Sequence, residues 1–259
     1  MSNTALQTKT EHALTDVLDY EFQRYDKVPV RDVCSGLAVR PSYLLEFDSP
    51  PADTTIPLEY AFHLLGDVHG KIVVDLGCGD GLNTVVLATL GARVIAVDHS
   101  KKNLKLTHER IRANGVSGRV NLVYSETGRI PVAAGIVDRV LCATALNDDC
   151  VVAARQIRRI LKPGGAAVFV QRLAATEWVR ELTGARTLTL EETGRVSRAV
   201  GQGNRRREFM LTSSLLERIG VESSTAVRRA HAVDAWLLGR FAVARKAAAA
   251  LVWEARKES

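Results

Sequence analysis

The chain has 259 residues, of which 46% are hydrophobic and 25% are charged, as in an average soluble globular protein. This composition excludes disorder over the whole length and provides a sizeable core for one large domain, or for one domain with an appended cap. No apolar run reaches the roughly 18 residues of a membrane span, and the N-terminus lacks a secretory pattern. Four cysteines without CxxC spacing predict reduced thiols, a cytoplasmic location and no metal site.

Charge is spread unevenly along the chain. Residues 1–150 carry a net charge of −4 and residues 151–259 a net charge of +10, which together give the overall +6. A basic half can serve a nucleic-acid or other anionic partner, or it can be a solvated, arginine-rich surface. The positive residues are scattered and few aromatic residues lie among them for base stacking, so nucleic-acid binding is disfavoured.

The first 66 residues form a mixed N-terminal segment. Apolar residues near helical spacing predict a helix over Asp16–Tyr25. Four prolines, at positions 41, 50, 51 and 57, predict a loop, and a short helix follows over Leu58–Leu65. We therefore divide the chain into an N-terminal segment, residues 1–66, and a main domain, residues 67–259.

From Lys71 onward, strands and helices alternate. Buried strands are predicted at 72–74, 94–97, 120–124, 137–142 and 166–170, and helices at 82–90, 100–114 and 149–161. Lys162-Pro163-Gly164-Gly165 is expected to end the third of these helices. This alternation indicates an α/β fold with a mostly parallel sheet and helices on both faces.

The C-terminal part has weaker patterns. A helix is expected over Thr189–Val200, and a second helical face is formed by residues 226, 230, 233, 237 and 241. A final strand is expected over Ala249–Trp253. Residues 172–207 stand out as a candidate insertion.

The segment Val74–Gly81 is rich in glycine and links a predicted strand to a predicted helix. Such a turn lets backbone approach a ligand closely and presents free N–H groups at a helix N-terminus. The dinucleotide fingerprint G-x-G-x-x-G would place its third glycine at position 82, where the chain has Leu82. Asp75 would also repel a pyrophosphate and attract an ammonium group, so an NAD-dependent oxidoreductase is disfavoured.

Three acids follow three successive strands. Asp75 ends the first, and Asp98 ends the second, 21 residues after Gly77, where a carboxylate can accept both hydroxyls of a ribose. Glu126 follows the third strand and can accept a hydrogen bond from an exocyclic amine. Helix capping would explain Asp98 alone. It does not explain why three acids follow three strands, at the edge where α/β sheets bind ligands.

Together these motifs resemble the class I S-adenosylmethionine-dependent methyltransferases, of the bacterial small-molecule type. The matching segments are VVDLGCGDG from Val73, AVDHS from Ala96, YSET from Tyr124, DRVLCATAL from Asp138 and ILKPGGAAVFV from Ile160. The resemblance implies a Rossmann-like sheet of seven strands in the order 3-2-1-4-5-7-6, with the last strand antiparallel. It also implies S-adenosyl-L-methionine as cofactor, S-adenosyl-L-homocysteine as product, and a small helical lid formed by residues 1–66.

The same resemblance assigns roles by position. Asp75 lies near the methionine ammonium, Asp98 takes the ribose hydroxyls, His99 packs near the adenine, and Ala143 backs the methionine chain. The full set of expected cofactor-binding residues is Asp75, Gly77, Cys78, Gly79, Asp98, His99, Ser125, Glu126, Thr127 and Ala143.

No catalytic residue is identified. The segment after the fourth strand carries Asn147 where many relatives have histidines, and Asn147 is no general base. Asn147, Tyr25 and Tyr43 are candidate acceptor-binding residues, and the arginines of residues 172–207 are a further candidate for holding an acidic acceptor. In-line methyl transfer needs mainly a well-placed acceptor, and a base only where the acceptor must lose a proton.

The resulting hypothesis is methyl transfer to an oxygen, nitrogen or carbon atom of a small molecule, such as a specialised metabolite or a quinone- or lipid-like compound. Two alternatives stay open: an RNA-modifying methyltransferase that uses the basic C-terminal half, and a non-catalytic cofactor-binding protein on the same fold. The sequence leaves the acceptor, the methylated atom and the oligomeric state undetermined.

Overall fold

The computed structural model describes most of the main domain. The described residues are 37–39, 41–54, 56–125, 129–143, 146, 149–172, 188–203, 205–209, 233, 234, 236, 237, 240 and 250–258. Contacts divide the chain into residues 1–37 and residues 38–259, and the description below concerns the second unit. The helix predicted over Asp16–Tyr25 lies outside the described residues.

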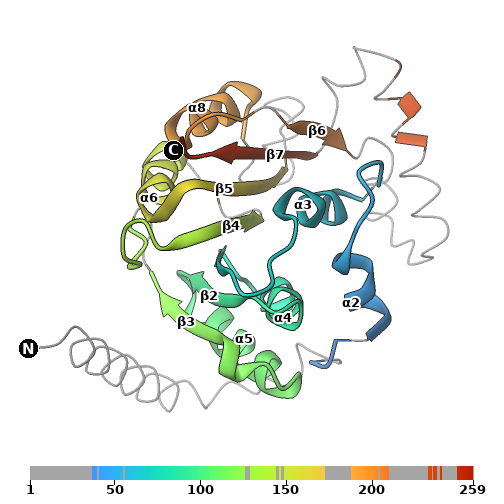
Figure 1. The fold of residues 1–259 in the computed structure, drawn as a ribbon, viewed down its shortest axis with the longest axis vertical. Helices are drawn as coiled ribbons and strands as arrows, with labels where there is room; N and C mark the ends of the chain where they lie inside the picture. Colours follow the sequence, from blue (N-terminus) through green and yellow to red (C-terminus); the bar gives the residue numbers. More distant parts are fainter. Residues whose placement is uncertain are drawn as a thin grey trace, which may run out of the picture. The chain divides into compact units, whose positions relative to one another are not determined.

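Seven strands form one sheet in the order β3-β2-β1-β4-β5-β7-β6 (Figure 1). Strands β1 to β5 pair in parallel, whereas β7 runs antiparallel to both β5 and β6. The predicted fold class, strand order and antiparallel last strand are therefore confirmed. The strands are β1 (Ile72–Leu76), β2 (Arg93–Asp98), β3 (Val120–Tyr124), β4 (Val137–Ala143), β5 (Leu161–Arg172), β6 (Arg206–Phe209) and β7 (Ala250–Arg256).

Helices cover both faces of the sheet, because neighbouring strand residues point to opposite sides and both sides are apolar. Val73 belongs to a core cluster with residues of one group of helices, whereas Val74 belongs to a cluster with residues of a second group. The first group is α2 (Pro41–Asp48), α3 (Pro57–Leu65), α4 (Leu82–Thr89) and α5 (Lys101–Ala113), and the second is α6 (Cys150–Ile160) and α8 (Leu190–Val200). A 3-10 turn, Ser117–Arg119, precedes β3.

The expected proline loop is wrong in part. Pro41 is the first residue of α2 and Pro57 the first residue of α3. Proline fits the first helical position, because its fixed φ suits the helix and its missing N–H would have no partner there. These two prolines therefore begin helices, while Pro50 and Pro51 lie between them.

The helix end expected at Lys162–Gly165 is confirmed. Helix α6 ends at Ile160, and β5 begins at Leu161 and continues through the proline and both glycines. The pairing of β4 with β5 shifts register there: Val137 lies opposite Leu161, but Arg139 lies opposite Ala166. The Pro-Gly-Gly sequence thus forms an irregularity inside a strand, which is where glycine is commonly found in strands.

The C-terminal strands differ in how well the sequence predicts them. β7 confirms the final strand and extends it to Arg256. The short β6 was not predicted, because its sequence RREF is mostly charged. Arg207 of β6 donates to the carbonyl oxygens of Ala52 and Thr54 at 3.3 and 2.8 Å, so it holds the segment before α3. This arginine, one of those proposed to hold an acceptor, is engaged in the fold.

Helix α8 confirms the helix expected from Thr189. The Thr189 hydroxyl accepts from the backbone N–H of Glu192, whose carboxylate accepts from the backbone N–H of Thr189, a reciprocal cap. Of the helical face expected over residues 226–241, only Val233 and Leu237 fall among the described residues; both are helical and Val233 is exposed. Among the described residues, no helix is long and apolar enough to cross a membrane.

Candidate functional site

The loop between β1 and α4 is held against the end of β2. The backbone N–H groups of Gly77 and Cys78 both donate to the carbonyl oxygen of Val97, at 2.7 and 3.1 Å. The Thr107 hydroxyl on α5 donates to the carbonyl oxygen of Gly79 at 3.0 Å. The glycine loop is thereby fixed by backbone and side-chain bonds from its neighbours, with its first residues beside the carboxyl end of β2.

Gly81, at the start of α4, has no room for a side chain. Its φ is +80°, in the left-handed region, and a Cβ there would lie 2.8 Å from the Cα of Thr107. The third glycine of the loop therefore serves close packing of α4 on α5, as well as the tight turn.

We expect Gly81→Ala to destabilise the protein more than Gly115→Ala. Gly115 has φ +69°, but no atom lies within 4 Å of the position that a Cβ would take, so its substitution costs only the backbone term of about 1 kcal/mol. Gly81→Ala adds overpacking against backbone, for a total of roughly 2–4 kcal/mol. Urea unfolding of both variants measures the difference, and equal losses would contradict this account.

Asp98 is buried at the end of β2, and three donors converge on its carboxylate. The backbone N–H of Gly79 donates to Oδ2 at 2.9 Å, and that of Ser100 donates to Oδ1 at 2.8 Å. The Asn103 amide nitrogen reaches Oδ1 at 3.2 Å and Oδ2 at 3.3 Å. Ser100 caps α5 by accepting from the backbone of Asn103, as predicted, so Asp98 is free of the capping role that would explain it structurally.

Asp75 is completely buried at the end of β1. Its Oδ2 accepts from the Thr84 hydroxyl at 2.6 Å, whereas Oδ1 has no hydrogen-bond partner among the described residues. Burial raises the pKa of Asp75 from 3.8 to about 6; the Thr84 bond opposes this rise and the charges of Asp98 and Asp80 add to it. A buried carboxyl with one unsatisfied oxygen favours a cationic or hydrogen-bonding ligand.

The thiol of Cys78 is buried in the same loop. Its pKa is raised by burial first, and then by the charge of Asp75. The thiolate, which is the nucleophilic form of cysteine, is therefore disfavoured here. Cys78 contributes backbone and packing to the loop.

The end of β3 joins this arrangement. The backbone N–H of Ser125 donates to the carbonyl oxygen of Asp98 at 3.0 Å. Ala143 ends β4, beside the loop, because Leu76 of β1 lies opposite Cys142 of β4. His99 follows Asp98 with its side chain 77% exposed, which leaves its ring face available for stacking. The structure therefore brings together the predicted residues Asp75, Gly77, Cys78, Gly79, Asp98, His99, Ser125 and Ala143.

The remaining predicted site residues fall outside this arrangement. Glu126, Thr127, Asn147 and Tyr25 lie outside the described residues. Tyr43 belongs to α2, and only its backbone is described. Their roles stay predictions. Within the described parts of the chain, no three His, Cys, Asp or Glu side chains gather as a metal site requires.

Sequence reasoning missed three polar residues of the helices behind the loop: Thr84, Asn103 and Thr107. Each carries a hydrogen bond to the loop or to one of its two buried acids. Thr84 and Thr107 are fully buried on helix faces that are mostly apolar. In the sequence, the one signal for these residues is a small polar residue on an apolar helix face. That signal does not identify the group with which the residue forms a hydrogen bond.

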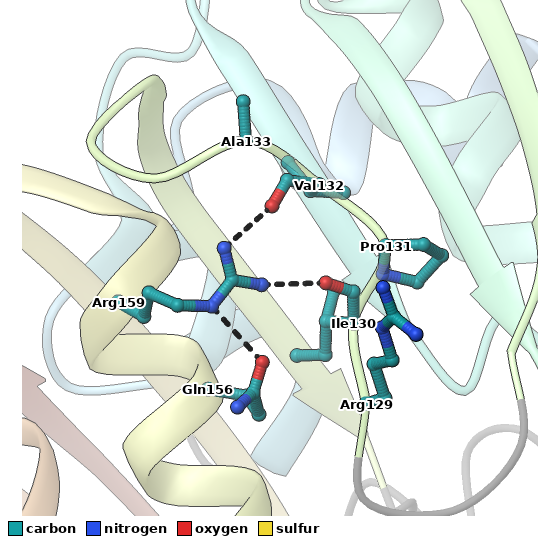
Figure 2. Close-up of a pocket in the computed structure, with 7 residues that line it drawn as sticks. All are labelled: Arg129, Ile130, Pro131, Val132, Ala133, Gln156 and Arg159. Carbon is teal, nitrogen blue, oxygen red and sulfur yellow. Dashed lines mark hydrogen bonds between the residues drawn. The ribbon is translucent and has the colours of Figure 1, made fainter.

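A hollow of about 700 Å³ lies where the segment before β4 meets α6 (Figure 2). The Arg159 guanidinium donates to the carbonyl oxygens of Ile130 and Val132, at 2.6 and 2.8 Å, and to the Gln156 side chain at 3.0 Å. One arginine thus ties the last turn of α6 to the segment that follows Ser125 in the chain.

This region is similar in sequence to known proteins. Residues 73–165 match the model of a methyltransferase domain. The chain is 31% identical, over 129 residues, to a ubiquinone biosynthesis O-methyltransferase of Bordetella avium, covering 48% of this chain and 52% of the relative. It is 34% identical, over 83 residues, to a ribosomal protein L11 methyltransferase of Aeromonas salmonicida, covering 32% of this chain and 28% of the relative. The chain thus spans about half the length of the first relative, and less of the second.

Solved structures show the same fold. A geranyl diphosphate C-methyltransferase from Streptomyces coelicolor aligns with TM-score 0.61 at 16% identity, covering 77% of each chain. The [4+2]-cyclase SpnF aligns with TM-score 0.54 at 22% identity, covering 73% of this chain and 76% of that one. One fold thus carries proteins with different activities, so the site must decide the function.

Proposed function

We propose that the chain, whose residues 73–165 match a methyltransferase domain model, is a class I S-adenosylmethionine-dependent methyltransferase. It would transfer a methyl group from S-adenosyl-L-methionine to an oxygen, nitrogen or carbon atom of a small molecule. The observation that carries this proposal is the pair of buried carboxylates, Asp75 and Asp98, at neighbouring strand ends beside the glycine loop. A cytoplasmic location is part of the same proposal.

The residues of the site fit this cofactor. The Asp98 carboxylate lies at the strand end where an acid can accept from a vicinal diol, and its orientation is fixed by donors from the loop and α5. The unsatisfied oxygen of Asp75 suits an ammonium group, directly or through water. The open backbone of Gly77 and Gly79 allows close approach of the cofactor chain. Glu126 and Thr127 are proposed for the adenine edge, and Ala143 for the methionine chain.

When bound, the cofactor would supply a methyl group on a positively charged sulfur, and the acceptor atom would bond to that methyl carbon as the carbon–sulfur bond breaks and S-adenosyl-L-homocysteine leaves. The chain's own residues would bind and orient it: Asp98 by accepting two hydroxyl hydrogen bonds and Asp75 by charge. Orientation alone can supply several kcal/mol towards such a substitution, so the proposal requires no general base.

For the acceptor, we propose a chemical class and not a single compound. One relative is named for ubiquinone biosynthesis and one structural neighbour for geranyl diphosphate, which supports a quinone- or lipid-like small molecule. We propose residues 1–66 as a lid over the acceptor and residues 172–207 as an acceptor-side insertion. Asn147, Tyr25 and Tyr43 are proposed acceptor contacts.

Titration calorimetry with S-adenosyl-L-homocysteine tests the cofactor proposal directly. We expect one molecule to bind per chain, in the micromolar range typical of substrate and cofactor sites. Absence of binding of both this product and S-adenosyl-L-methionine, by a protein that unfolds cooperatively, would overturn the proposal.

Two other functions make different predictions. An RNA-modifying enzyme, suggested by the +10 charge of residues 151–259, would bind RNA with an affinity that falls steeply with salt; the ribosomal protein L11 methyltransferase relatives are named for a protein acceptor, and add no support for RNA. A cofactor-binding protein without methyl transfer, as the cyclase name SpnF permits for this fold, would bind the cofactor but never consume it.

A further inference from the structure

We propose that Asn103 is a positioning residue that holds the Asp98 carboxylate in the orientation a ribose diol requires. This inference rests on the proposed function, because it takes the ligand of Asp98 to be the cofactor ribose. Asn103 belongs to none of the motifs that carry the family resemblance, and it reaches Asp98 from the first turn of α5.

A carboxylate at the end of a strand does not orient itself. The terminal torsion of an aspartate side chain is broad, so neighbouring donors must define its plane. The backbone N–H groups of Gly79 and Ser100 each bond one oxygen of Asp98. Gly79 belongs to the loop after β1 and Ser100 to the segment after β2. The directions of these two hydrogen bonds therefore depend on two separate parts of the chain.

The Asn103 amide is different, because one nitrogen reaches both oxygens at nearly equal distances, 3.2 and 3.3 Å. A donor that is shared by both oxygens opposes rotation of the carboxylate in either direction. A carboxylate can accept about four hydrogen bonds, so the three donors leave capacity for about one more, and a second hydroxyl would share an oxygen with the Asn103 amide.

Asn103 is itself held in place. Its backbone N–H donates to the Ser100 hydroxyl at 3.2 Å, and the backbone N–H of Ser100 donates to Asp98. The first turn of α5 and its cap thus fix the backbone from which the Asn103 amide reaches the carboxylate.

The test is a double-mutant cycle with binding of S-adenosyl-L-homocysteine as the readout. We expect Asn103→Ala to weaken binding about tenfold, the size of one hydrogen bond to a charged group. In the Asp98→Ala background the same substitution should change affinity less than twofold. Lys102→Ala is the matched control on the same turn; it is exposed and should leave binding unchanged.

A merely structural role for Asn103 would weaken all ligands alike, so a second ligand separates the two roles. With the 2′-deoxy analogue of S-adenosyl-L-homocysteine, we expect the loss caused by Asn103→Ala to shrink. Asn103→Leu, which keeps the size of the side chain and favours the helix, should reproduce the loss without destabilising the fold.

The outcomes are distinguishable. Unchanged or tighter binding by both Asn103 variants, or an equal loss in the Asp98→Ala background, overturns the positioning role while leaving the proposed function intact. Failure of the unmodified protein to bind either cofactor form overturns the proposed function itself.

Discussion

Replacement of Asp98 by alanine should lower the affinity for S-adenosyl-L-homocysteine by a factor of about 100 to 1,000. The carboxylate is buried, each of its oxygens can accept a ribose hydroxyl, and a hydrogen bond to a charged group contributes about 1.5–3 kcal/mol. Losing two such bonds, each at the lower end of that range, corresponds to a change of that size. Titration calorimetry of the variant and the unmodified protein, at the same pH and salt concentration, provides the measurement.

The matched control is Asp80→Ala. Asp80 lies in the same loop, but its side chain is 50% exposed and pairs with Arg110 at 2.8 Å. Its removal changes the local charge by the same amount without touching the buried acceptors, so we expect a change in affinity of about threefold or less. If Asp80→Ala weakened binding as much as Asp98→Ala, the effect would be one of net charge and the ribose role of Asp98 would be lost.

Asp98→Ala also leaves the backbone N–H groups of Gly79 and Ser100 without their partner. An unsatisfied buried donor costs about 1–3 kcal/mol, so the variant is expected to unfold at lower urea concentration. Asp98→Asn keeps one acceptor and the shape of the side chain, and should restore part of this stability, because one of the two backbone N–H groups would then face an amide donor. Because it offers one acceptor oxygen to the ligand, it should not restore the full affinity.

The sheet and its order could be predicted because apolar strands and helical faces alternate regularly between Lys71 and Val170. Prediction failed where a local signal competes with packing. The proline pattern predicts a loop that includes Pro41 and Pro57, although a proline can also begin a helix, as both do here. The strand predicted at 166–170 begins earlier, at Leu161, because β5 includes the Pro-Gly-Gly sequence as an irregularity.

The candidate site was predictable in its acids and glycines, since these stand at the ends of strands that the sequence pattern locates. Its support was not predictable. Thr84 is nine residues from Asp75 in the chain, and its bond to that carboxylate depends on how α4 packs against β1. In the sequence, Asn103 resembles an ordinary residue of a helix. Residues that act through a buried acid have no spacing rule of their own, and only three-dimensional packing identifies them.

Replacement of Asp75 by asparagine should make the protein more stable and less able to bind the cofactor. Burial raises the pKa of Asp75 from 3.8 to about 6, so the folded protein resists ionisation of this carboxyl. A rise of about two pKa units corresponds to about 3 kcal/mol. Asparagine avoids this cost because it has no charge, and its side-chain oxygen can still accept from the Thr84 hydroxyl.

The sign of the pH dependence follows from the same shift. Because the folded state holds the proton more tightly than the unfolded state, the unmodified protein is favoured below pH 4 and loses this contribution as the pH rises to about 6. The stability difference between Asp75→Asn and the unmodified protein should therefore be small at pH 4 and grow to about 3 kcal/mol by pH 7. Urea unfolding between these pH values measures it, and a difference independent of pH would contradict the burial argument.

Binding should show the opposite preference. An ionised Asp75 attracts the ammonium group, so the affinity of the unmodified protein for S-adenosyl-L-homocysteine should rise between pH 5 and 7, while that of Asp75→Asn stays low and flat. Thr84→Val removes the bond that lowers the pKa of Asp75 and should move the rise in affinity to higher pH. In its ionised form, Asp75 is expected to lower the stability of the fold and to support binding of the cofactor. We therefore infer that its role is in binding and not in stability.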